Sequence, residues 1–418
     1  MFERALDAAF RRLIRNGSLR IIWPDGHRTE YGGGAGAQPA AQFALRSRAA
    51  VKRMLLHPEL ATGELYMDGG LVPTGCGIFD VVDVLKLNTA SVPALSFPIL
   101  NSRRLIGWTR RRLDQFNPAR RARQNVAHHY DLSDSLYRLF LDADRQYSCA
   151  YFPTGEETLE EAQNAKKHHI AAKLLLTRPR LRVLDIGCGW GGLALTLARD
   201  YGAVVTGITL SEEQLAVARN RAAEAGLGDR VSFELMDYRM VSGPFDRIVS
   251  VGMFEHVGVV HYRTFFNVLA RALARDGVAL LHTIGRRGPP DATNPWITKY
   301  IFPGGYTPAL SEIMPPIERS GLAVTDLEVL RRHYALTLRA WRERFESHRD
   351  EIAAMFDERF CRMWEFYLIG AERSFSREEL ENFQIQLAYA GADLPLTRDY
   401  MADAAAPRSR ARTPVSAA

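Results

Sequence analysis

The chain of 418 residues is 47% hydrophobic and 24% charged, and its formal net charge at neutral pH is +6. This length favours two domains, or one large domain with a smaller one, and the composition is sufficient for buried cores. The positive charge favours an acidic partner, but it does not distinguish nucleic acid from anionic lipid. Four scattered cysteines with no metal or disulfide spacing indicate a reducing compartment. No segment approaches the roughly 20 apolar residues of a spanning helix, so we expect a cytoplasmic protein whose membrane contact is peripheral.

Residues 1–100 are expected to form a small α+β domain that docks substrate or membrane. The first 14 residues predict an amphipathic helix with arginines on its polar faces. Packing on its own domain is the favoured role of this helix, and contact with an anionic bilayer surface is the alternative. Residues 17–27 alternate and turn at Pro-Asp-Gly, as in a β-hairpin. Helical spacing returns at 43–56 and 78–87.

A basic linker is expected at residues 101–123, since eight arginines lie between Arg103 and Arg123. Such a run is usually a solvated face, although near a bilayer each Lys or Arg can add about 1 kcal/mol of attraction to anionic lipid. Nucleic-acid binding is less favoured, because aromatic residues are sparse and no recognition motif is present. The end of the chain, residues 396–418, is expected to be disordered, since Ala, Arg, Ser and Pro dominate it.

The clearest motif lies at residues 181–195, where an apolar run from Val183 to Ile186 leads into a glycine-rich turn and then helical spacing. The glycines let the backbone come close to a ligand. This Asp-x-Gly-x-Gly-x-Gly pattern resembles class I methyltransferases, in which it packs against the amino-acid end of S-adenosylmethionine. A dinucleotide-binding turn is the nearest rival, but no acidic residue closes the next strand. A purely structural turn is the remaining alternative.

Strands and helices alternate from residue 181 to residue 285. The expected strands after the first are 203–210, 231–236, 245–251 and 277–284, and the expected helices are 211–224 and 262–273. This alternation predicts an α/β fold with a doubly wound, mostly parallel sheet, and ligands gather at the carboxyl ends of such strands.

Three further segments make the resemblance specific. Residues 125–137, 146–152 and 294–305 strongly resemble the cyclopropane-fatty-acyl-phospholipid synthases and the related mycolic-acid cyclopropane synthases. The resemblance implies a catalytic domain at 124–395 with a seven-stranded sheet and helical insertions that cover an acyl chain. It also implies transfer of a methylene group from S-adenosylmethionine to a cis double bond of a membrane phospholipid, giving a cyclopropane. The first hundred residues resemble the N-terminal domain of the family members that act on phospholipids, which implies a substrate in an anionic membrane surface. A homodimer is left open.

The motif, the strand ends and the resemblance together assign the site. The residues expected to bind S-adenosylmethionine are Tyr147, Ser148, Asp185, Gly187, Cys188, Gly189, Trp190, Gly191, Thr209, Leu210, Ser211, Gln214, Asp237 and Tyr238. In the family a bound bicarbonate is the base, and the matching residues that would hold it are Cys149, Glu255, His282, Ile284 and Tyr334. Taken alone, His282 is most simply a core histidine and Glu255 a capping carboxylate, but their place on the edge that carries the glycine turn favours a catalytic role.

No metal site is expected, because the adjacent histidines at 128–129 and 168–169 cannot share one helix face. Two alternatives to the cyclopropane product remain. One is a lipid methyltransferase that gives a methyl-branched or methylene product. The other is a catalytically silent lipid-binding protein, against which the intact Cys149, Glu255 and His282 argue.

Overall fold

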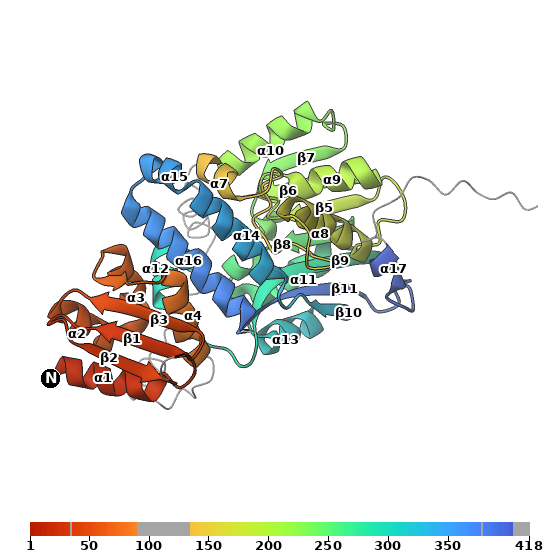
Figure 1. Ribbon diagram of the computed structural model, residues 1–418. Helices are drawn as coiled ribbons and strands as arrows, with labels where there is room; N and C mark the ends of the chain where they lie inside the picture. The colour runs from red at the N-terminus through yellow and green to blue at the C-terminus, as the bar shows by residue number, and fades with distance from the viewer. Residues whose placement is uncertain (34–35, 90–133, 378, 404–418) are drawn as a thin grey trace, which may run out of the picture.

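The computed structural model describes residues 1–33, 36–89, 134–377 and 379–403 (Figure 1). They form a four-stranded sheet near the N-terminus and a seven-stranded sheet downstream. The expected linker at 101–123 and the first part of the segment 125–137 lie outside the described residues. No helix within the described ranges combines the length and the hydropathy needed to cross a membrane.

The N-terminal part is a small sheet covered by helices. Its elements are α1 (Phe2–Leu13), β1 (Ser18–Ile22), β2 (Arg28–Gly32), β3 (Ala40–Leu45), α2 (Arg48–Leu56), α3 (Pro58–Met67), β4 (Leu71–Pro73) and α4 (Ile78–Thr89). The strand order is β2-β1-β3-β4, with the predicted hairpin between β1 and β2 and a parallel pair between β1 and β3. Helix α1 buries Leu6 and Phe10 in the core of this part, so it packs on its own domain, as favoured.

The prediction of a helix over residues 43–56 is wrong at its start, because the helix begins at Arg48. Phe43 and Leu45 belong to strand β3, in which every second side chain is buried. Helix α2 begins only at Arg48, after Ser47, whose side chain accepts a hydrogen bond from the Ala50 amide. The strand alternation from Ala41 onward therefore overrides the apparent helical spacing.

The large sheet has the order β10-β11-β9-β8-β5-β6-β7. Its strands are β5 (Arg182–Ile186), β6 (Val204–Thr209), β7 (Val231–Leu235), β8 (Phe245–Val251), β9 (Leu273–Arg286), β10 (Leu322–Val329) and β11 (Leu380–Tyr389). Strands β5 to β9 are parallel, whereas β11 runs antiparallel between β9 and β10. The fold is the seven-stranded methyltransferase architecture that the sequence predicts.

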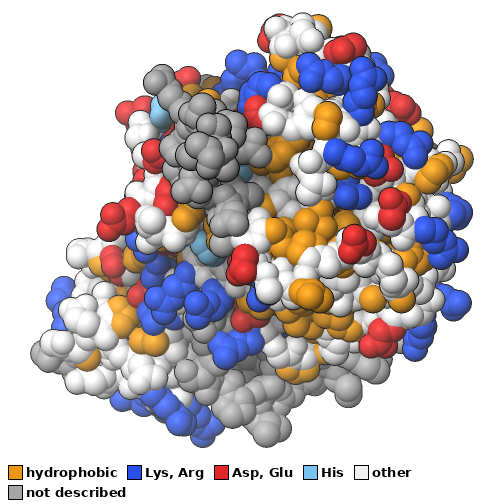
Figure 2. Space-filling model, turned by 90° about the vertical axis from the view of Figure 1, so that its right-hand side faces the viewer, with side chains coloured by type: hydrophobic (Ala, Val, Ile, Leu, Met, Phe, Trp, Pro, Cys, Tyr) orange, Lys and Arg blue, Asp and Glu red, His pale blue; other side chains and the backbone are white. Residues whose placement is uncertain are grey.

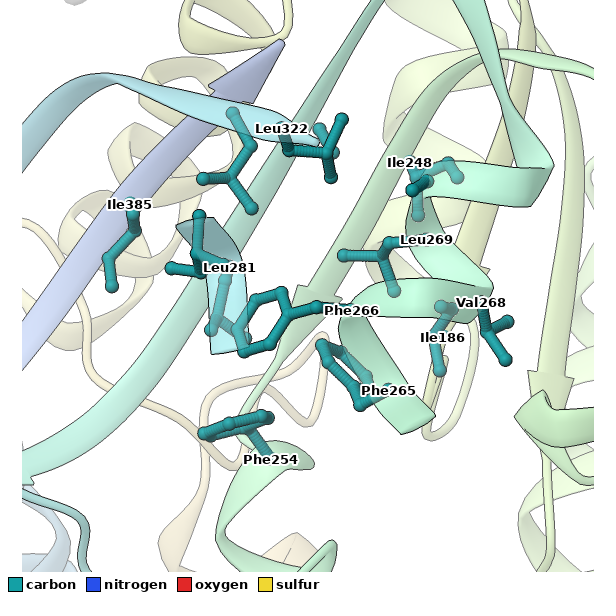
Figure 3. Close-up of a cluster of buried hydrophobic side chains, with 14 of the residues drawn as sticks. Ile186, Ile248, Phe254, Phe265, Phe266, Val268, Leu269, Leu281, Leu322 and Ile385 are labelled. Atoms are coloured by element: carbon teal, nitrogen blue, oxygen red, sulfur yellow. The ribbon is translucent and has the colours of Figure 1, made fainter. Parts of the chain in front are cut away.

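Helices cover both faces of this sheet. They are α8 (Leu159–Lys173), α9 (Gly192–Tyr201), α10 (Glu212–Glu224), α11 (Tyr262–Ala272) and α13 (Leu310–Ser320). Figure 3 shows Phe265, Phe266 and Leu269 of α11 in one buried cluster with Leu281 and Ile385 of the sheet. This buried packing fixes the strands whose ends carry the site.

A separate group of helices lies between the large sheet and the N-terminal part (Figure 1). It comprises α7 (Asp134–Phe140), α12 (Pro295–Tyr300), α14 (His333–Ser347), α15 (Arg349–Met355) and α16 (Glu358–Ser376). The Glu64 carboxylate of α3 accepts hydrogen bonds from Lys299 (2.7 Å) and Tyr300 (2.9 Å) of α12. Tyr66 donates to Glu365 of α16 at 2.6 Å. The expected role of these helices, to cover an acyl chain, stays a prediction.

The expectation of disorder from residue 396 is wrong for the helix α17 (Asp399–Asp403). The Tyr400 hydroxyl accepts a hydrogen bond from Gln386 of β11 at 2.9 Å, and Met401 is buried. These two contacts hold the segment on the sheet. The rest of the tail, from residue 404, lies outside the described residues.

Candidate active site

The glycine turn joins β5 to α9 and requires glycine at specific positions. Gly187, Gly189 and Gly191 have φ angles of 81°, 54° and 83°, which other residues rarely adopt. A Cβ atom on Gly187 would lie 2.8 Å from the Cβ of Met253. The turn therefore brings its backbone against the loop that follows β8, with no room for a side chain.

A cavity opens beside this turn, at the carboxyl ends of β5 to β8. Its lining includes all the residues expected to bind S-adenosylmethionine except Gly191 and Ser211. Gly191 lies at the start of α9, where a Cβ atom would meet the Phe233 ring at 2.6 Å. Ser211 caps α10 by accepting a hydrogen bond from the Gln214 amide at 3.2 Å. These two residues support the turn and the helix and do not line the cavity.

The ends of β6 and β7 place further polar groups on the cavity wall. At the end of β6, the Thr209 hydroxyl donates to the Gln214 side chain at 3.1 Å. At the end of β7, Asp237 pairs with Arg239 at 2.6 Å. The polar atoms of Gln214, Asp237 and Arg239 thus lie where the cofactor's ribose and adenine are expected.

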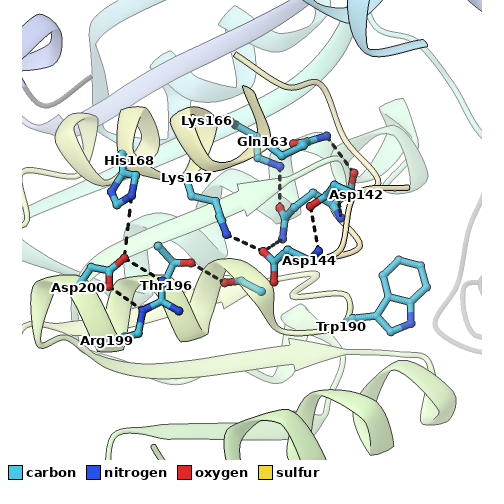
Figure 4. A network of polar contacts seen from close by, with 12 residues as sticks. Asp142, Asp144, Gln163, Lys166, Lys167, His168, Trp190, Thr196, Arg199 and Asp200 are labelled. Atoms are coloured by element: carbon cyan, nitrogen blue, oxygen red, sulfur yellow. Dashed lines mark hydrogen bonds and ion pairs between the residues drawn. The ribbon is translucent and has the colours of Figure 1, made fainter. Parts of the chain in front are cut away.

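The loop that carries Tyr147 and Ser148 is held by a polar network that the sequence analysis missed (Figure 4). The Lys166 ammonium of α8 donates to the Gln146 side chain at 2.6 Å and to the Ser148 hydroxyl at 2.8 Å. Lys167 pairs with Asp144 at 2.7 Å. A Cβ atom on Gly192 would lie 2.4 Å from the Asp144 carboxylate, so a larger residue there would displace this part of the network.

Arg221 of α10 closes this network from the other side. It donates to the backbone oxygen of Trp190 at 2.8 Å and pairs with Asp144. The glycine turn, the loop and α8 are therefore connected by charged hydrogen bonds, and the aromatic ring of Tyr147 is held against Trp341 with their centroids 5.1 Å apart.

Lys166 and Asp185 are oppositely charged groups on the cavity wall. Lys166 is fully buried, and burial lowers its pKa to about 8. Asp185 is also buried, and burial raises its pKa to about 7. One oxygen of Asp185 has no hydrogen-bond partner among the described residues. Near neutral pH the wall thus offers the Lys166 cation and an Asp185 carboxyl group that is about half ionised, next to the glycine turn.

Glu255 and Ile284 of the expected catalytic set are in direct contact. Glu255 follows β8, and one of its carboxylate oxygens accepts a hydrogen bond from the Ile284 amide at 2.6 Å. The second oxygen is buried, and no described residue bonds to it. Burial raises the pKa of Glu255 to about 7. The carboxyl group is therefore poised to carry a proton near neutral pH.

His282 lies on the same face of β9 as Ile284, two residues before it, and is only 1% exposed. Its Nδ1 atom lies 3.1 Å from the side-chain nitrogen of Gln384. Its Nε2 atom is buried with no hydrogen-bond partner in the described part of the chain. Burial and the cations of Lys166 and Lys173 hold the pKa of His282 well below its usual value, so the ring is neutral.

Cys149 and Tyr334 share a buried apolar cluster against which Ile284 packs. Cys149 is fully buried, and burial raises the pKa of its thiol, so it is a neutral group and not a nucleophile. The next residue, Ala150, donates to Thr337 of α14 at 3.0 Å. Tyr334 begins the same helix and packs on Phe375, with ring centroids 4.6 Å apart.

None of the five expected catalytic residues belongs to the cavity lining, as far as the described residues go. The Glu255–Ile284 hydrogen bond and a shared apolar cluster join Cys149, Glu255, Ile284 and Tyr334, and His282 lies two residues before Ile284 on β9. Lys166, which lines the cavity, bears a charge that acts on both Cys149 and His282. The histidines at 168 and 169 are used elsewhere: His168 contacts Tyr201, and His169 pairs with Glu328 at 2.7 Å.

The seven-stranded fold and the glycine-turn cavity define an S-adenosylmethionine-dependent methyltransferase. Residues 117–385 match the family model of mycolic acid cyclopropane synthetases, and the chain belongs to this family. It is an enzyme homologous to the cyclopropane-fatty-acyl-phospholipid synthases, within a family of cyclopropane fatty acid synthases and fatty acid methyltransferases.

Two relatives and one structure show the extent of the similarity. The chain is 40% identical over 334 residues to the cyclopropane-fatty-acyl-phospholipid synthase of Escherichia coli, covering 80% of this chain and 84% of the relative. It is 36% identical over 399 residues to a tuberculostearic acid methyltransferase of Mycobacterium tuberculosis, covering 91% and 90%. The mycolic acid cyclopropane synthase CmaA1, solved with S-adenosylhomocysteine, has 34% identity and a TM-score of 0.60 over 66% of this chain and 99% of its own. S-adenosylmethionine is therefore the methyl donor.

Proposed function

We propose that this enzyme transfers a methylene group from S-adenosylmethionine to the cis double bond of an unsaturated acyl chain in a membrane phospholipid, forming a cyclopropane. The proposal rests chiefly on the buried side chains of Glu255 and His282 and on the Ile284 amide that donates to Glu255, at the ends of strands that also form the cofactor cavity. The similarity to the Escherichia coli phospholipid synthase over 80% of the chain supports the substrate class.

This reaction makes three demands on the protein. An alkene is a poor nucleophile, and methyl transfer to it leaves a carbocation on the neighbouring carbon. Ring closure then requires loss of a proton from the added methyl group. The site must therefore exclude water, tolerate positive charge and supply a base. The complete burial of Cys149 and the near-complete burial of His282 support the exclusion of water.

Lys166 and Asp185 suit the zwitterionic amino-acid end of the donor. The ammonium of Lys166 can pair with its carboxylate, and the carboxylate of Asp185 can pair with its amino group. Both side chains line the cavity. Among the described residues Lys166 donates to Gln146 and Ser148, two of the three hydrogen bonds that an ammonium can donate. The protein therefore matches the two charges of the donor with two fixed opposite charges.

The donor set around Glu255 fits a small oxyanion such as bicarbonate. Bound there, bicarbonate would supply the base that accepts the proton. The buried Nε2 of His282 and the second oxygen of Glu255 are polar atoms with no partner in the described structure. With its pKa raised to about 7, Glu255 can be protonated and donate to an anion instead of repelling it. Cys149 and Tyr334 would complete the group with a thiol and a phenol.

The N-terminal part supports peripheral contact with an anionic bilayer. Met1 and Phe2 are exposed, and the Lys52 ammonium lies 5.4 Å from the centre of the Phe2 ring. Arg4 and Arg12 of α1 are exposed beside them. Figure 2 shows Lys and Arg side chains gathered at the lower left and the upper right of one face of the molecule. Exposed apolar residues among cations favour an anionic lipid surface.

The test is incubation of the purified enzyme with methyl-labelled S-adenosylmethionine and vesicles of unsaturated phospholipid, followed by fatty-acid analysis. A labelled cyclopropane is expected. A methyl-branched or methylene product would support the second candidate function, which the similarity to the tuberculostearic acid methyltransferase over 91% of the chain favours. Absence of transfer from a folded, donor-binding protein would indicate a silent lipid-binding protein and overturn both.

A further inference from the structure

Strand β11 carries an unusual row of buried amides. Asn382, Gln384 and Gln386 alternate with the apolar Phe383 and Ile385, so the three amides share one face. All three are at most 1% exposed. Burying an amide is unfavourable unless it is hydrogen-bonded, so each needs a partner or a function.

The three amides are not equivalent. The Gln386 nitrogen donates to the backbone oxygen of Lys173 at 2.6 Å and to the Tyr400 hydroxyl at 2.9 Å, which is a structural role. The Gln384 nitrogen faces Nδ1 of His282 at 3.1 Å, and the oxygen of Gln384 has no partner among the described residues. Among the described residues, the side-chain amide of Gln384 therefore has one hydrogen-bond partner, which is His282.

The strand register makes this contact direct. Gln384 is paired with His282 of β9 on one side and with Glu328 of β10 on the other, so the three side chains form a row across the sheet. Glu328 is already occupied by His169 and Lys173, at 2.7 and 2.5 Å. The charged groups whose fields act on His282 are therefore Lys166, Lys173, His169 and Glu328. The ring itself touches the neutral amide, not these charges.

The contact determines which nitrogen of the ring carries the proton. An amide N–H facing Nδ1 requires Nδ1 to accept, and a neutral imidazole that accepts at Nδ1 carries its hydrogen on Nε2. Nε2 is the buried, unpartnered atom at the end of the strand that also supplies the Ile284 amide to Glu255. The ring then presents an N–H donor to the site and has no lone pair available there.

We propose that Gln384 is a positioning residue that locks His282 in the Nε2–H tautomer, so that His282 serves the reaction as a hydrogen-bond donor to an anion and not as the base. This inference rests on the proposed function, since it assigns a role within the same site. It follows that the atom that takes the proton belongs to another group, held between His282 and Glu255. An apolar residue at position 384 leaves Nδ1 without a donor and frees the ring to adopt either tautomer.

The direct test is ¹⁵N NMR of enzyme labelled selectively in its histidine rings, with the His282 signals assigned by their loss in His282→Ala. We expect the Nε2–H tautomer in the wild-type enzyme, with Nδ1 showing the shift of an unprotonated nitrogen. An Nδ1–H tautomer, or a doubly protonated ring at neutral pH, overturns the proposal. This experiment needs neither turnover nor a folded Gln384 variant, so its result is separable from failure of the proposed function.

A second test uses Gln384→Met, with Gln386→Met as the matched control from the same buried face. In Gln384→Met we expect loss of the single tautomer and at least a tenfold rise in the KM for bicarbonate added to carbonate-free buffer. The affinity for S-adenosylhomocysteine should remain within twofold. Gln386→Met removes three structural hydrogen bonds, two donated by the amide nitrogen and one accepted from Thr325 at 2.8 Å. It should lower thermal stability and leave the tautomer and the KM for bicarbonate unchanged. An unchanged tautomer in folded Gln384→Met, or an equal change in both variants, contradicts the proposal.

Discussion

Replacement of Lys166 by methionine should selectively weaken binding of the methyl donor. The change removes the ammonium that lines the cavity and holds Gln146 and Ser148 at 2.6 and 2.8 Å. A hydrogen bond to a charged group contributes about 1.5–3 kcal/mol. Loss of one such bond to the donor's carboxylate therefore weakens binding by about 10- to 140-fold, at about 1.4 kcal/mol for each factor of ten.

The assay is calorimetric titration with S-adenosylhomocysteine as a function of pH. The ammonium of Lys166 is present below its pKa of about 8 and is lost above it, whereas the carboxylate of Asp185 is present above its pKa of about 7. Wild-type affinity should therefore be greatest between these two values and fall on both sides. Lys167→Met is the matched control, since Lys167 pairs with Asp144 and does not line the cavity. Full affinity in folded Lys166→Met, or a flat pH profile in the wild type, would refute the reasoning.

Glu255→Gln and His282→Ala should bind S-adenosylhomocysteine normally and lose turnover, and full product formation by both variants would remove their catalytic assignment. Burial raises the Glu255 pKa from 4.5 to about 7, so the buried group stabilises the fold only while it is protonated. As the pH rises from about 4.5 to about 7, the free energy of unfolding of the wild type should therefore fall by about 3 kcal/mol. Denaturant titration should not find this fall in Glu255→Gln. Gly187→Ala should lower the free energy of unfolding by about 1–3 kcal/mol through backbone strain at its positive φ alone. The added Cβ atom would also clash with Met253 at 2.8 Å. Unchanged stability and donor affinity would contradict the role of the turn. Phe265→Ala, at a fully buried position of the main core, should cost about 3–5 kcal/mol in denaturant unfolding, and a loss below about 1 kcal/mol would show that the site collapses freely.

The parts of the fold that the sequence predicts well are those with local signals. The run from Val183 to Ile186 and the glycines after it specify a strand and a turn over a few residues, and the structure places both there. The parallel pairing of β1 with β3 has no such signal, because it joins segments separated by the hairpin. The misplaced helix start before Arg48 has a related cause, since alternation and helical spacing overlap over short apolar runs.

The site residues that the sequence did not reveal all act through distant partners. Lys166 lies on a helix whose spacing shows nothing unusual, and its importance appears only when α8 is packed against the loop at 146–148. Gln384 meets His282 across 102 positions of sequence. Neither residue stands out in the sequence, because its face carries other polar side chains, such as Gln163 on α8 and Gln386 on β11. A polar residue on a buried face needs a partner, but the sequence does not say which one.

The proposed reaction builds a cyclopropane on a phospholipid acyl chain. Mass spectrometry of vesicle fatty acids, after reaction with S-adenosylmethionine labelled in the methyl carbon, identifies the product. An unsaturated acyl chain should gain one labelled CH₂ group, lose its double bond and carry the label in a three-membered ring. A labelled chain with a methyl branch or a methylene group, or vesicles that gain no label from a donor-binding enzyme, would contradict the proposed reaction.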